Sequence, residues 1–463
     1  REMNTRLMKT YEDITFSDAI DSDIKRENAN INGDSAMGSM LKFGSEGAKQ
    51  FYDMYVLNPR HAQAHRAGDI HIHDLDFLTL TTTCCQIDLL ELFKNGFSTG
   101  HGVLREPQDI ASYSALCCIA IQANQNDQHG GQSIVNFDYG MAPGVKKTYR
   151  KRFRDNVSRL LDAGYEVADS DALTRAMLQA VEEETGLVPE MEEKPAFDAA
   201  LIAQLSAHMT EAEAQKLLKT VRRFSHKEIV KATYQAMEAL VHNLNTMNSR
   251  AGAQVPFSSI NYGMDTSPEG RLVMEQLLLA TEAGLGRGET PIFPIQIFRV
   301  KEGVNYNPED PNYDLFRLAI RCSAKRLFPN FSFMDAPYNK KYYKPGHPET
   351  EVGYMGCRTR VLANAYDENG EVAPRRGNLS FTSINLPRIA IEAKGDINWF
   401  YEELERRMDL VFDQLNERFE IIARKKVYNF PFLMGQHVWK DSEKLKWDDE
   451  VREVLKHGTL TMG

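Results

Sequence analysis

The sequence lacks the features that mark secreted, membrane-spanning or nucleic-acid-binding proteins. Its longest apolar run, residues 115–123, is too short to cross a bilayer and contains a glutamine. No signal peptide is visible, because residues 1–15 are charged and polar with no apolar segment behind them. Positive charge is not in excess, and the formal net charge of −10 argues against a bulk electrostatic grip on DNA or RNA. We therefore expect a cytoplasmic protein that binds neither nucleic acid nor membrane, although a few local donors could still hold a nucleotide.

Cysteine is scarce and lacks the spacing of a metal site. No CxxC occurs, so the sequence contains no zinc ribbon. Two adjacent pairs and two single residues do not resemble a secreted disulfide framework either. We expect free thiols in a reducing cytosol, most of them acting as small buried hydrophobes. The six are Cys84, Cys85, Cys117, Cys118, Cys322 and Cys357.

Standard phosphate loops are absent as well. Residues 140–148 read GMAPGVKKT and lack the Gly-Lys-Ser/Thr of a Walker A loop. Residues 284–288 read GLGRG but follow a predicted helix, whereas a dinucleotide fingerprint opens a helix after a strand. We interpret this second segment as the C-terminal turn of a helix.

What the sequence does contain is an alternation of helical and strand-like segments. A length of 463 residues suits two to three average domains, or one large α/β barrel with insertions. Pro143 is expected in the first turn of a helix, after a loop at residues 133–142. Strands separated by long helices predict an α/β fold with a largely central sheet. Helices are predicted at 37–55, 108–124, 144–161, 226–247, 268–283, 312–327 and 397–427, and strand-like segments at 69–76, 255–262, 291–298, 330–334 and 379–386, with 79–87 either a strand or a buried loop.

Residues 165–225 differ in character from the rest. They are rich in Glu and Ala, have helical periodicity, and are broken by Pro189 and Pro195. We interpret them as a helical insertion on the surface rather than a separate domain. The polar residues 1–35 read as a linker. Because the chain starts with Arg1 and its last residues read as the start of a strand, we expect a fragment, or a chain whose ends are missing.

Three polar segments are candidate binding features. His71 and His73 lie two residues apart and would face the same side of a strand. We prefer a hydrogen-bonded strand end beside an active site, able to touch a ribose or phosphate, over a metal site. Residues 129–132 (HGGQ) would let a backbone approach closely, although turn structure alone explains them equally well. Cys357 follows a glycine in the long irregular stretch 335–376, where it could be a finger threaded into a barrel or an inert loop thiol.

Four motifs taken in order decide between these readings. They are HIHDLD (71–76), TTTCCQIDL (81–89), MGC (355–357) and GNLSFTSINLP (377–387). Each is weak alone, but the ordered set resembles the anaerobic, class III ribonucleotide reductases of the glycyl-radical superfamily. The resemblance extends over nearly the whole chain. It implies a ten-stranded α/β barrel over residues 36–463, with a central finger loop that carries a cysteine.

The resemblance gives roles to individual cysteines. Cys357 would carry the transient thiyl radical that removes hydrogen from ribose C3′. A second cysteine, on a strand facing the finger, would deliver hydrogen at the other ribose face. We favour Cys84 over Cys85, because counting back from the Ile-Asp-Leu shared with the family reaches Cys84. Adjacent strand residues point to opposite faces, so only one of the pair can serve. Cys117, Cys118 and Cys322 match no catalytic position and are expected to be structural.

The resemblance also implies polar contacts to the substrate. Asn378 would hydrogen-bond the ribose hydroxyls, and Met355 would lie beside the radical cysteine. Family members with this pair generally use formate as reductant. Ser380, His71 and His73 are further candidate substrate-binding residues, and no metal ligand is expected in these 463 residues.

Further components are implied by the family. These are a stable glycyl radical after a four-cysteine zinc site, neither of which this sequence contains, a radical-SAM activase, and in many members a preceding ATP-cone domain. Relatives are homodimers, some in higher oligomers, whose bound ATP, dATP or other deoxynucleotide effectors select the nucleoside triphosphate that is reduced. Residues 101–107 and the helix from residue 144 are the candidate effector region.

Two other functions stay open at this point. One is another glycyl-radical enzyme, a lyase or a dehydratase, which is expected to show Cys-Cys or Cys-x-Glu at the fingertip. Here Arg358 and Thr359 follow Cys357, and Thr359 also disfavours the Asn-x-Cys-x-Glu pattern of aerobic and cobalamin-dependent reductases. The other is a non-catalytic nucleotide-binding relative, which has no reason to retain Cys84, Cys357 and Asn378 together.

Overall fold

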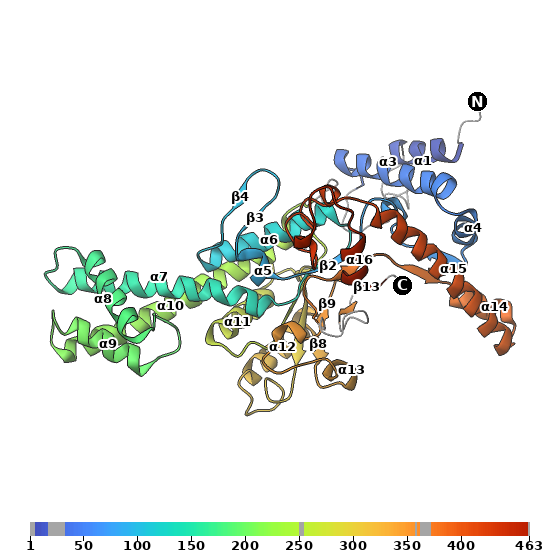
Figure 1. Ribbon diagram of the computed structural model, residues 1–463. Coiled ribbons are helices and arrows are strands. Elements are labelled where there is room, and N and C mark those ends of the chain that lie inside the picture. The colour runs from blue at the N-terminus through green and yellow to red at the C-terminus, as the bar shows by residue number, and fades with distance from the viewer. Residues whose placement is uncertain (1–4, 17–32, 250–253, 357–358, 362–371, 462–463) are drawn as a thin grey trace.

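A seven-stranded sheet lies at the centre of the chain (Figure 1). The computed structural model describes residues 5–16, 33–249, 254–356, 359–361 and 372–461. Five neighbouring strands run parallel, and two further strands extend the β2 edge, the first antiparallel to β2 and the second parallel to the first. In spatial order the strands are β13 (Thr459–Thr461), β11 (Gly377–Asn378), β2 (Cys84–Ile87), β5 (Gln132–Ile134), β6 (Ser258–Tyr262), β7 (Ile295–Val300) and β8 (Asn330–Phe333).

Three small antiparallel pairs complete the strands. They are β1 (Ile70–Ile72) with β12 (Thr382–Ile384), β3 (Phe97–Ser98) with β4 (Val103–Leu104), and β9 (Gly353–Tyr354) with β10 (Arg360–Val361). The described residues thus form a mixed α/β fold with a seven-stranded sheet. The ten-stranded barrel stays a prediction.

Helices make up most of the remaining chain. The α-helices are α1 (Thr5–Phe16), α3 (Ala36–Phe51), α4 (Pro59–Ala67), α5 (Leu89–Phe93), α6 (Ile110–Asp127), α7 (Phe137–Gly164), α8 (Ser170–Thr185), α9 (Pro195–Leu205), α10 (Glu211–Thr246), α11 (Pro268–Ala283), α12 (Tyr313–Arg326), α13 (Pro337–Lys340), α14 (Leu386–Ala393), α15 (Ile397–Ala423) and α16 (Arg452–Gly458). Short π or 3-10 turns are η1 (Tyr52–Val56), η2 (Leu75–Phe77), η3 (Pro348–Thr350), η4 (Val427–Asn429) and η5 (Ser442–Lys444). Within the described residues, no helix has both the length and the apolar character needed to span a bilayer.

The two faces of the sheet differ in chemistry because successive strand residues point to opposite sides. On one face Ile87, Ile260 and Phe298 join the main apolar core, which also takes residues from α6, α7, α10, α11 and α12. On the other face the central strands carry polar side chains, among them Ser133 and Asn261, that contact residues 351–354. We call these the helix face and the finger face.

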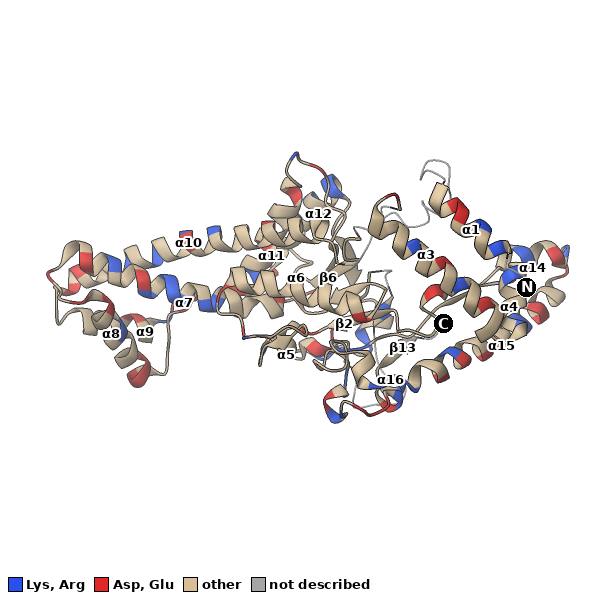
Figure 2. Ribbon diagram, turned by 90° about the horizontal axis from the view of Figure 1, so that it is seen from above, with Lys and Arg blue, Asp and Glu red and all other residues tan. Residues whose placement is uncertain are grey.

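Helices α7 and α10 run beyond the sheet and carry α8 and α9 at their far end (Figure 1). We call residues 147–228 of this arrangement the helical extension. Phe153 and Phe197 pack edge to face there, with ring centroids 5.8 Å apart. The Thr210 hydroxyl and the Glu213 carboxylate form a reciprocal capping box at the start of α10. Both acidic and basic side chains occur along α7 and α10, which is typical of solvated helices (Figure 2).

Three sequence-based predictions need correction. Helix α7 begins at Phe137, not after Pro143, so residues 137–142 are helical and Pro143 lies inside the helix. The alternation at 379–386 forms a strand only at β12, Thr382–Ile384, which pairs with β1, and Leu386 already begins α14. The strand-like segment 69–76 is a strand only at Ile70–Ile72, because Asp74 adopts a positive φ of 51° and starts a 3-10 turn.

Candidate active site

The finger face brings two of the predicted catalytic residues together. Strands β2 and β11 are antiparallel, and Asn378 is directly opposite Cys84 in their register. Directly opposed residues project from the same face of a sheet. Both are buried, with exposed fractions of 0% for Asn378 and 1% for Cys84. A thiol and an amide are therefore adjacent on a face shielded from water.

Cys84 and Cys85 have opposite surroundings. Cys84 packs in a small cluster with Val135, Met355 and Val361, so it faces the segment that contains the MGC motif. Cys85 belongs to the main core on the helix face, where burial raises the pKa of its thiol to about 12. Only Cys84 of the pair contacts the finger side.

The segment around the MGC motif is a β-hairpin, which we call the finger. Strand β9 pairs with β10 so that Tyr354 is opposite Arg360, and the Met355 amide donates to the Thr359 carbonyl at 3.0 Å. Cys357, the predicted radical residue, and Arg358 fall outside the described residues. The residues on either side of them, Gly356 and Thr359, are described.

Glycines allow the finger to lie directly on the sheet. A side-chain carbon added at Gly131 would lie 3.1 Å from the Gly356 nitrogen and 3.2 Å from its Cα. The Gly131 amide also donates to the Cys84 sulfur at 3.2 Å. The Gly-rich turn at 129–132 therefore permits a specific close approach between the fingertip and the strand beside Cys84.

The Tyr354 backbone is held by side chains of two central strands. Asn261 on β6 accepts from the Tyr354 amide at 2.8 Å and donates to its carbonyl at 2.9 Å. The Ser133 hydroxyl donates to the same carbonyl at 2.8 Å. At the side-chain end, the Tyr354 phenol lies 2.9 Å from the Ser332 hydroxyl. Three strands thus fix the finger just before its tip.

A buried ion pair anchors the base of the finger. Arg299 on β7 is 1% exposed and donates to the Glu351 carboxylate at 2.9 Å, to the Val352 carbonyl at 2.7 Å and to the Val135 carbonyl at 2.6 Å. The Tyr139 hydroxyl donates to the other Glu351 oxygen at 2.8 Å. Burial raises the pKa of Glu351 to about 8, and the Arg299 guanidinium opposes that rise.

Some polar atoms on the finger face have no partner among the described residues. Asn378 donates from its amide nitrogen to the Thr359 hydroxyl at 3.2 Å, but its Oδ1 accepts no hydrogen bond. Both amide atoms of Gln86, two residues beyond Cys84 and on the same face, are also unsatisfied. Buried polar groups are normally hydrogen-bonded, so these atoms point to a polar ligand or to water at this face.

The other predicted substrate contacts lie on or next to the β1–β12 pair rather than on the main sheet: His71 is in β1, His73 follows β1, and Ser380 precedes β12. The rings of His71 and His73 are 4.7 Å apart, and the His73 Nε2 is 2.7 Å from the Ser383 hydroxyl. Burial, followed by His71, lowers the pKa of His73. Arg418 of α15 donates to the Ser380 hydroxyl at 2.6 Å and to the His73 carbonyl at 3.2 Å. These residues form one group beside the β1–β12 pair.

Sequence reasoning missed Asn261, Arg299 and Arg418. Each had a visible signal. Asn261 and Arg299 are polar residues within apolar strands, and Arg418 lies on the apolar stripe of a long helix, where it is 1% exposed. Burial lowers the pKa of Arg418 to about 10. A charged or amide side chain at a core position is the observation to look for.

The candidate effector region is brought together by one lysine. Lys147 of α7 donates to the Glu106 carboxylate at 2.6 Å and to the Pro107 carbonyl at 2.9 Å. The loop at residues 101–107 therefore lies against the helix from residue 144, as an effector site built from both would require.

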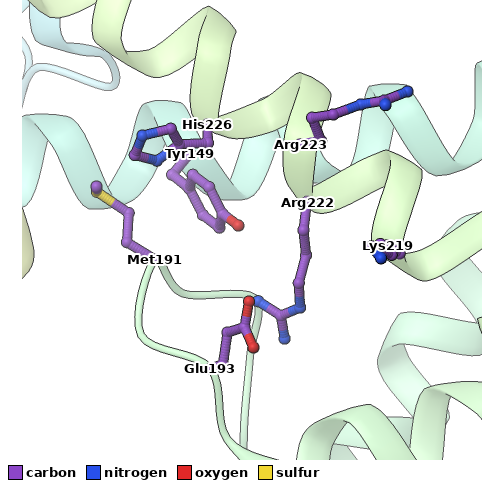
Figure 3. A pocket seen from close by; sticks show the side chains of 7 residues that line it. All are labelled: Tyr149, Met191, Glu193, Lys219, Arg222, Arg223 and His226. Carbon is purple, nitrogen blue, oxygen red and sulfur yellow. The ribbon is translucent and has the colours of Figure 1, made fainter.

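Open pockets in the described residues lie away from the finger. One of about 340 Å³ is in the helical extension, between α7, α10 and the loop after α8 (Figure 3). A second of about 440 Å³ lies beside α15. No group of three or more His, Cys, Asp or Glu side chains among the described residues could hold a metal ion. The lining residues of the first pocket are Tyr149, Met191, Glu193, Lys219, Arg222, Arg223 and His226.

Comparison with known proteins agrees with this geometry. A family model described as "Anaerobic ribonucleoside-triphosphate reductase" matches residues 27–463. The curated protein of that name from Escherichia coli (strain K12) is 29% identical over 419 residues, which are 90% of this chain and 49% of the relative. The one from Enterobacteria phage T4 is 28% identical over 403 residues, 86% of this chain and 56% of the relative. The chain therefore spans about half the length of the curated relatives it matches.

Solved structures give the same likeness at the level of the fold. A structure titled "Anaerobic ribonucleotide reductase" has a TM-score of 0.56 at 13% identity, covering 94% of this chain and 58% of that one. The Thermotoga maritima anaerobic ribonucleotide reductase in complex with dATP and CTP has a TM-score of 0.55 at 13% identity, covering 94% of this chain and 64% of that one. At such identities the likeness concerns the fold alone.

Proposed function

This chain belongs to the anaerobic ribonucleoside-triphosphate reductase family, and from that premise we propose that it is the catalytic core of an enzyme that reduces ribonucleoside triphosphates to deoxyribonucleoside triphosphates. The observation that carries the proposal is the pairing of Cys84 with Asn378 on the buried face that the MGC finger contacts. Neither a lyase nor a dehydratase is favoured by any contact on this face.

The chemistry divides between two thiols. In the proposed reaction the Cys357 sulfur takes the ribose 3′ hydrogen, so an S–H bond forms as the C3′–H bond breaks. Cys84 delivers a hydrogen atom to C2′ from the other face as the protonated 2′ hydroxyl leaves as water, formate restores the hydrogen of Cys84, and Cys357 returns its hydrogen to C3′. Formate is the proposed reductant and is oxidised to CO₂, which balances the two electrons that the ribose gains. A glycyl radical, which this sequence does not contain, supplies the unpaired electron that Cys357 carries.

The polar residues of the face orient the substrate in this proposal. Asn378 hydrogen-bonds the ribose hydroxyls, and its unsatisfied Oδ1 supports that role. Met355 packs against Cys84 and keeps water from the reacting atoms. His71, His73 and Ser380 bind the outer part of the nucleotide, where Arg418 adds a cation suited to phosphate.

The remaining expectations complete the proposal. Residues 1–35 are a linker that follows an ATP-cone where one is present, and residues 36–463 are a ten-stranded barrel whose insertion is 165–225. The zinc site, the glycyl radical, the radical-SAM activase and the homodimer belong to the full enzyme in the cytoplasm. Effector deoxynucleotides bind near Lys147 and Glu106, a placement that their 2.6 Å contact supports.

The decisive experiment uses the full-length enzyme, activated anaerobically and supplied with formate. We expect deoxynucleotide formation by the wild type and none by Cys357→Ala or Cys84→Ala, with the glycyl radical still visible by EPR in both variants. Cys85→Ala and Cys322→Ala serve as matched controls, because these thiols lie in the core on the helix face, and both should retain turnover. Undiminished turnover in Cys357→Ala would remove the thiyl assignment. A wild type with a radical but no deoxynucleotide product would remove the proposed substrate.

A further inference from the structure

One buried amide grips the finger from below. Asn261 is 0% exposed and lies on β6, and its carboxamide meets both backbone groups of Tyr354, at 2.8 Å for the amide and 2.9 Å for the carbonyl. A side-chain amide has the same donor and acceptor as a peptide group, so it can pair with a strand as a neighbouring strand would. The finger thus gains a two-point attachment to the sheet surface.

The amide itself is held in one orientation. Its nitrogen also contacts the Ile134 carbonyl at 3.2 Å and the Ser133 hydroxyl at 3.1 Å, both from the adjacent β5. Flipping the carboxamide would set its oxygen against two carbonyls and its nitrogen against an amide N–H. The contacts therefore fix which end of Asn261 faces which backbone group of Tyr354.

The attachment point is close to the tip of the finger. Tyr354 precedes Cys357 by three residues, and between them Gly356 rests on Gly131. Strand β5 separates Asn261 on β6 from Cys84 on β2, so Asn261 is not placed to touch the reacting atoms. Any influence it has on chemistry must pass through the finger backbone.

We propose that Asn261 is a positioning residue that sets the height and rotation of the finger above Cys84, acting through the Tyr354 backbone. The proposal rests on the function proposed above, because the position of the finger matters for catalysis only if the finger and Cys84 act on the same substrate. A two-point attachment fixes both the distance of the strand from the sheet and its rotation, whereas one hydrogen bond would fix only the distance. Misplacement of reacting groups by about 1 Å can lower a rate by roughly 100-fold.

The same strand provides a matched control. Ser259 is two residues before Asn261 on the same face and is also buried, yet its hydroxyl has no hydrogen-bond partner among the described residues. Ser259→Ala removes a buried polar group from the finger face without removing a contact to the finger. Ser332→Ala removes the contact to the Tyr354 phenol but leaves the Tyr354 backbone attached.

The test compares Asn261→Ala, Asn261→Asp and the two serine controls in the activated full-length enzyme. We expect kcat to fall by about 100-fold in Asn261→Ala with KM changed only a few-fold and with the glycyl radical yield unchanged. Asn261→Asp keeps the acceptor for the Tyr354 amide but sets an oxygen against the Tyr354 and Ile134 carbonyls, so its kcat should also fall. The serine controls should stay within a few-fold of wild type. A pure stability role would lower soluble yield and radical yield instead, and would leave kcat per radical unchanged.

Hydrogen exchange gives a readout that does not depend on turnover. The Tyr354 amide donates to Asn261, so its exchange should accelerate at least tenfold in Asn261→Ala while amides of the helical extension stay as in wild type. Unchanged exchange at Tyr354, or kcat per radical equal to wild type in a folded variant, would overturn the proposal. If Asn261→Ala does not fold, kcat per radical in Asn261→Asp decides, because this variant keeps the acceptor for the Tyr354 amide but loses the donor to the Tyr354 carbonyl. A wild type without reductase activity would defeat the proposed function alone, because the exchange experiment still tests the attachment.

Discussion

The finger and the helical extension are both projecting segments, but different interactions attach them to the rest of the chain. At the base of the finger one arginine that is 1% exposed reaches two carbonyls and a carboxylate from three separate positions. In the extension Arg159 pairs with Glu228 at 3.5 Å, and its side chain is 58% exposed. The first arrangement fixes the base of the finger through several buried, directional hydrogen bonds. The second leaves the helices to be held by apolar packing and end caps.

The difference follows from what lies beneath each segment. The finger rests on a sheet face lined with polar side chains, so hydrogen bonds and glycine contacts must hold it. The extension has its own apolar interior, with Phe153, Val181 and Leu201 all at 0% exposure. Apolar packing is strong but not directional, whereas hydrogen bonds are directional and individually modest. Hydrogen bonds are therefore better suited than apolar packing to a segment that must hold one atom in an accurate position.

The largest expected effect is the loss of the buried arginine. Arg299→Met should lower the free energy of unfolding by about 3–5 kcal/mol, because it leaves Glu351 and two backbone carbonyls buried without their partner. Arg159→Met, its counterpart in the extension, should lower it by no more than about 1 kcal/mol because that pair is exposed to solvent. Urea denaturation of both variants measures the two values. Equal losses would mean that the two regions do not differ in the way described.

The next effect is a pH dependence confined to the base of the finger. The pKa of Glu351 is raised to about 8 in the folded chain, above the ordinary value of 4.5, because of burial. Between these values the folded state binds a proton that the unfolded state has released. The contribution of this group to stability is therefore fully present at low pH and is lost as pH rises toward about 8.

The measurement is the difference in unfolding free energy between wild type and Glu351→Gln across that range. Between about pH 6.5 and pH 8 the wild type should lose roughly 1 kcal/mol of unfolding free energy per pH unit relative to Glu351→Gln. Asp127 and Asp265, whose pKa values burial raises to about 6, titrate mostly below this window. Glu228→Gln, made in the extension, controls for removal of a carboxylate. A difference that does not vary with pH would show that Glu351 stays ionised beside Arg299.

The fold was predictable where local periodicity and packing agree. The helix expected at 312–327 is α12 at Tyr313–Arg326, and the strand expected at 330–334 is β8 at Asn330–Phe333. The prediction failed at Pro143 because burial outweighed propensity. Phe137 and Met141 are both at 0% exposure in the main core, and their burial together offsets the roughly 3 kcal/mol that an internal proline costs a helix.

The site was only partly predictable for a related reason. The motifs identified Cys84 and Asn378, and the strand register then placed them opposite each other. No motif identifies Asn261, because its role depends on Tyr354, which lies 93 residues further along the chain. The sequence does show that Ser259 and Asn261 alternate with Ile260 and Tyr262, and this predicts one polar face. It does not show what covers that face.

The smallest expected effect comes from adding a single methyl group in each region, at Gly131 beside the finger and at Gly164 in the extension. Gly131→Ala would place a carbon 3.1 Å from the Gly356 nitrogen, so the fingertip must move away by a few tenths of an ångström. We expect kcat to fall about tenfold, less than for a displacement of about 1 Å. Gly164→Ala in α7 meets no atom within 4 Å and should stabilise the helix by about 0.5 kcal/mol without affecting kcat. Steady-state kinetics at matched radical content, with thermal unfolding of both variants, measures the contrast. If Gly131→Ala retains full activity, the close approach of Gly131 and Gly356 is not needed for catalysis. The finger would then tolerate displacement as readily as the extension does.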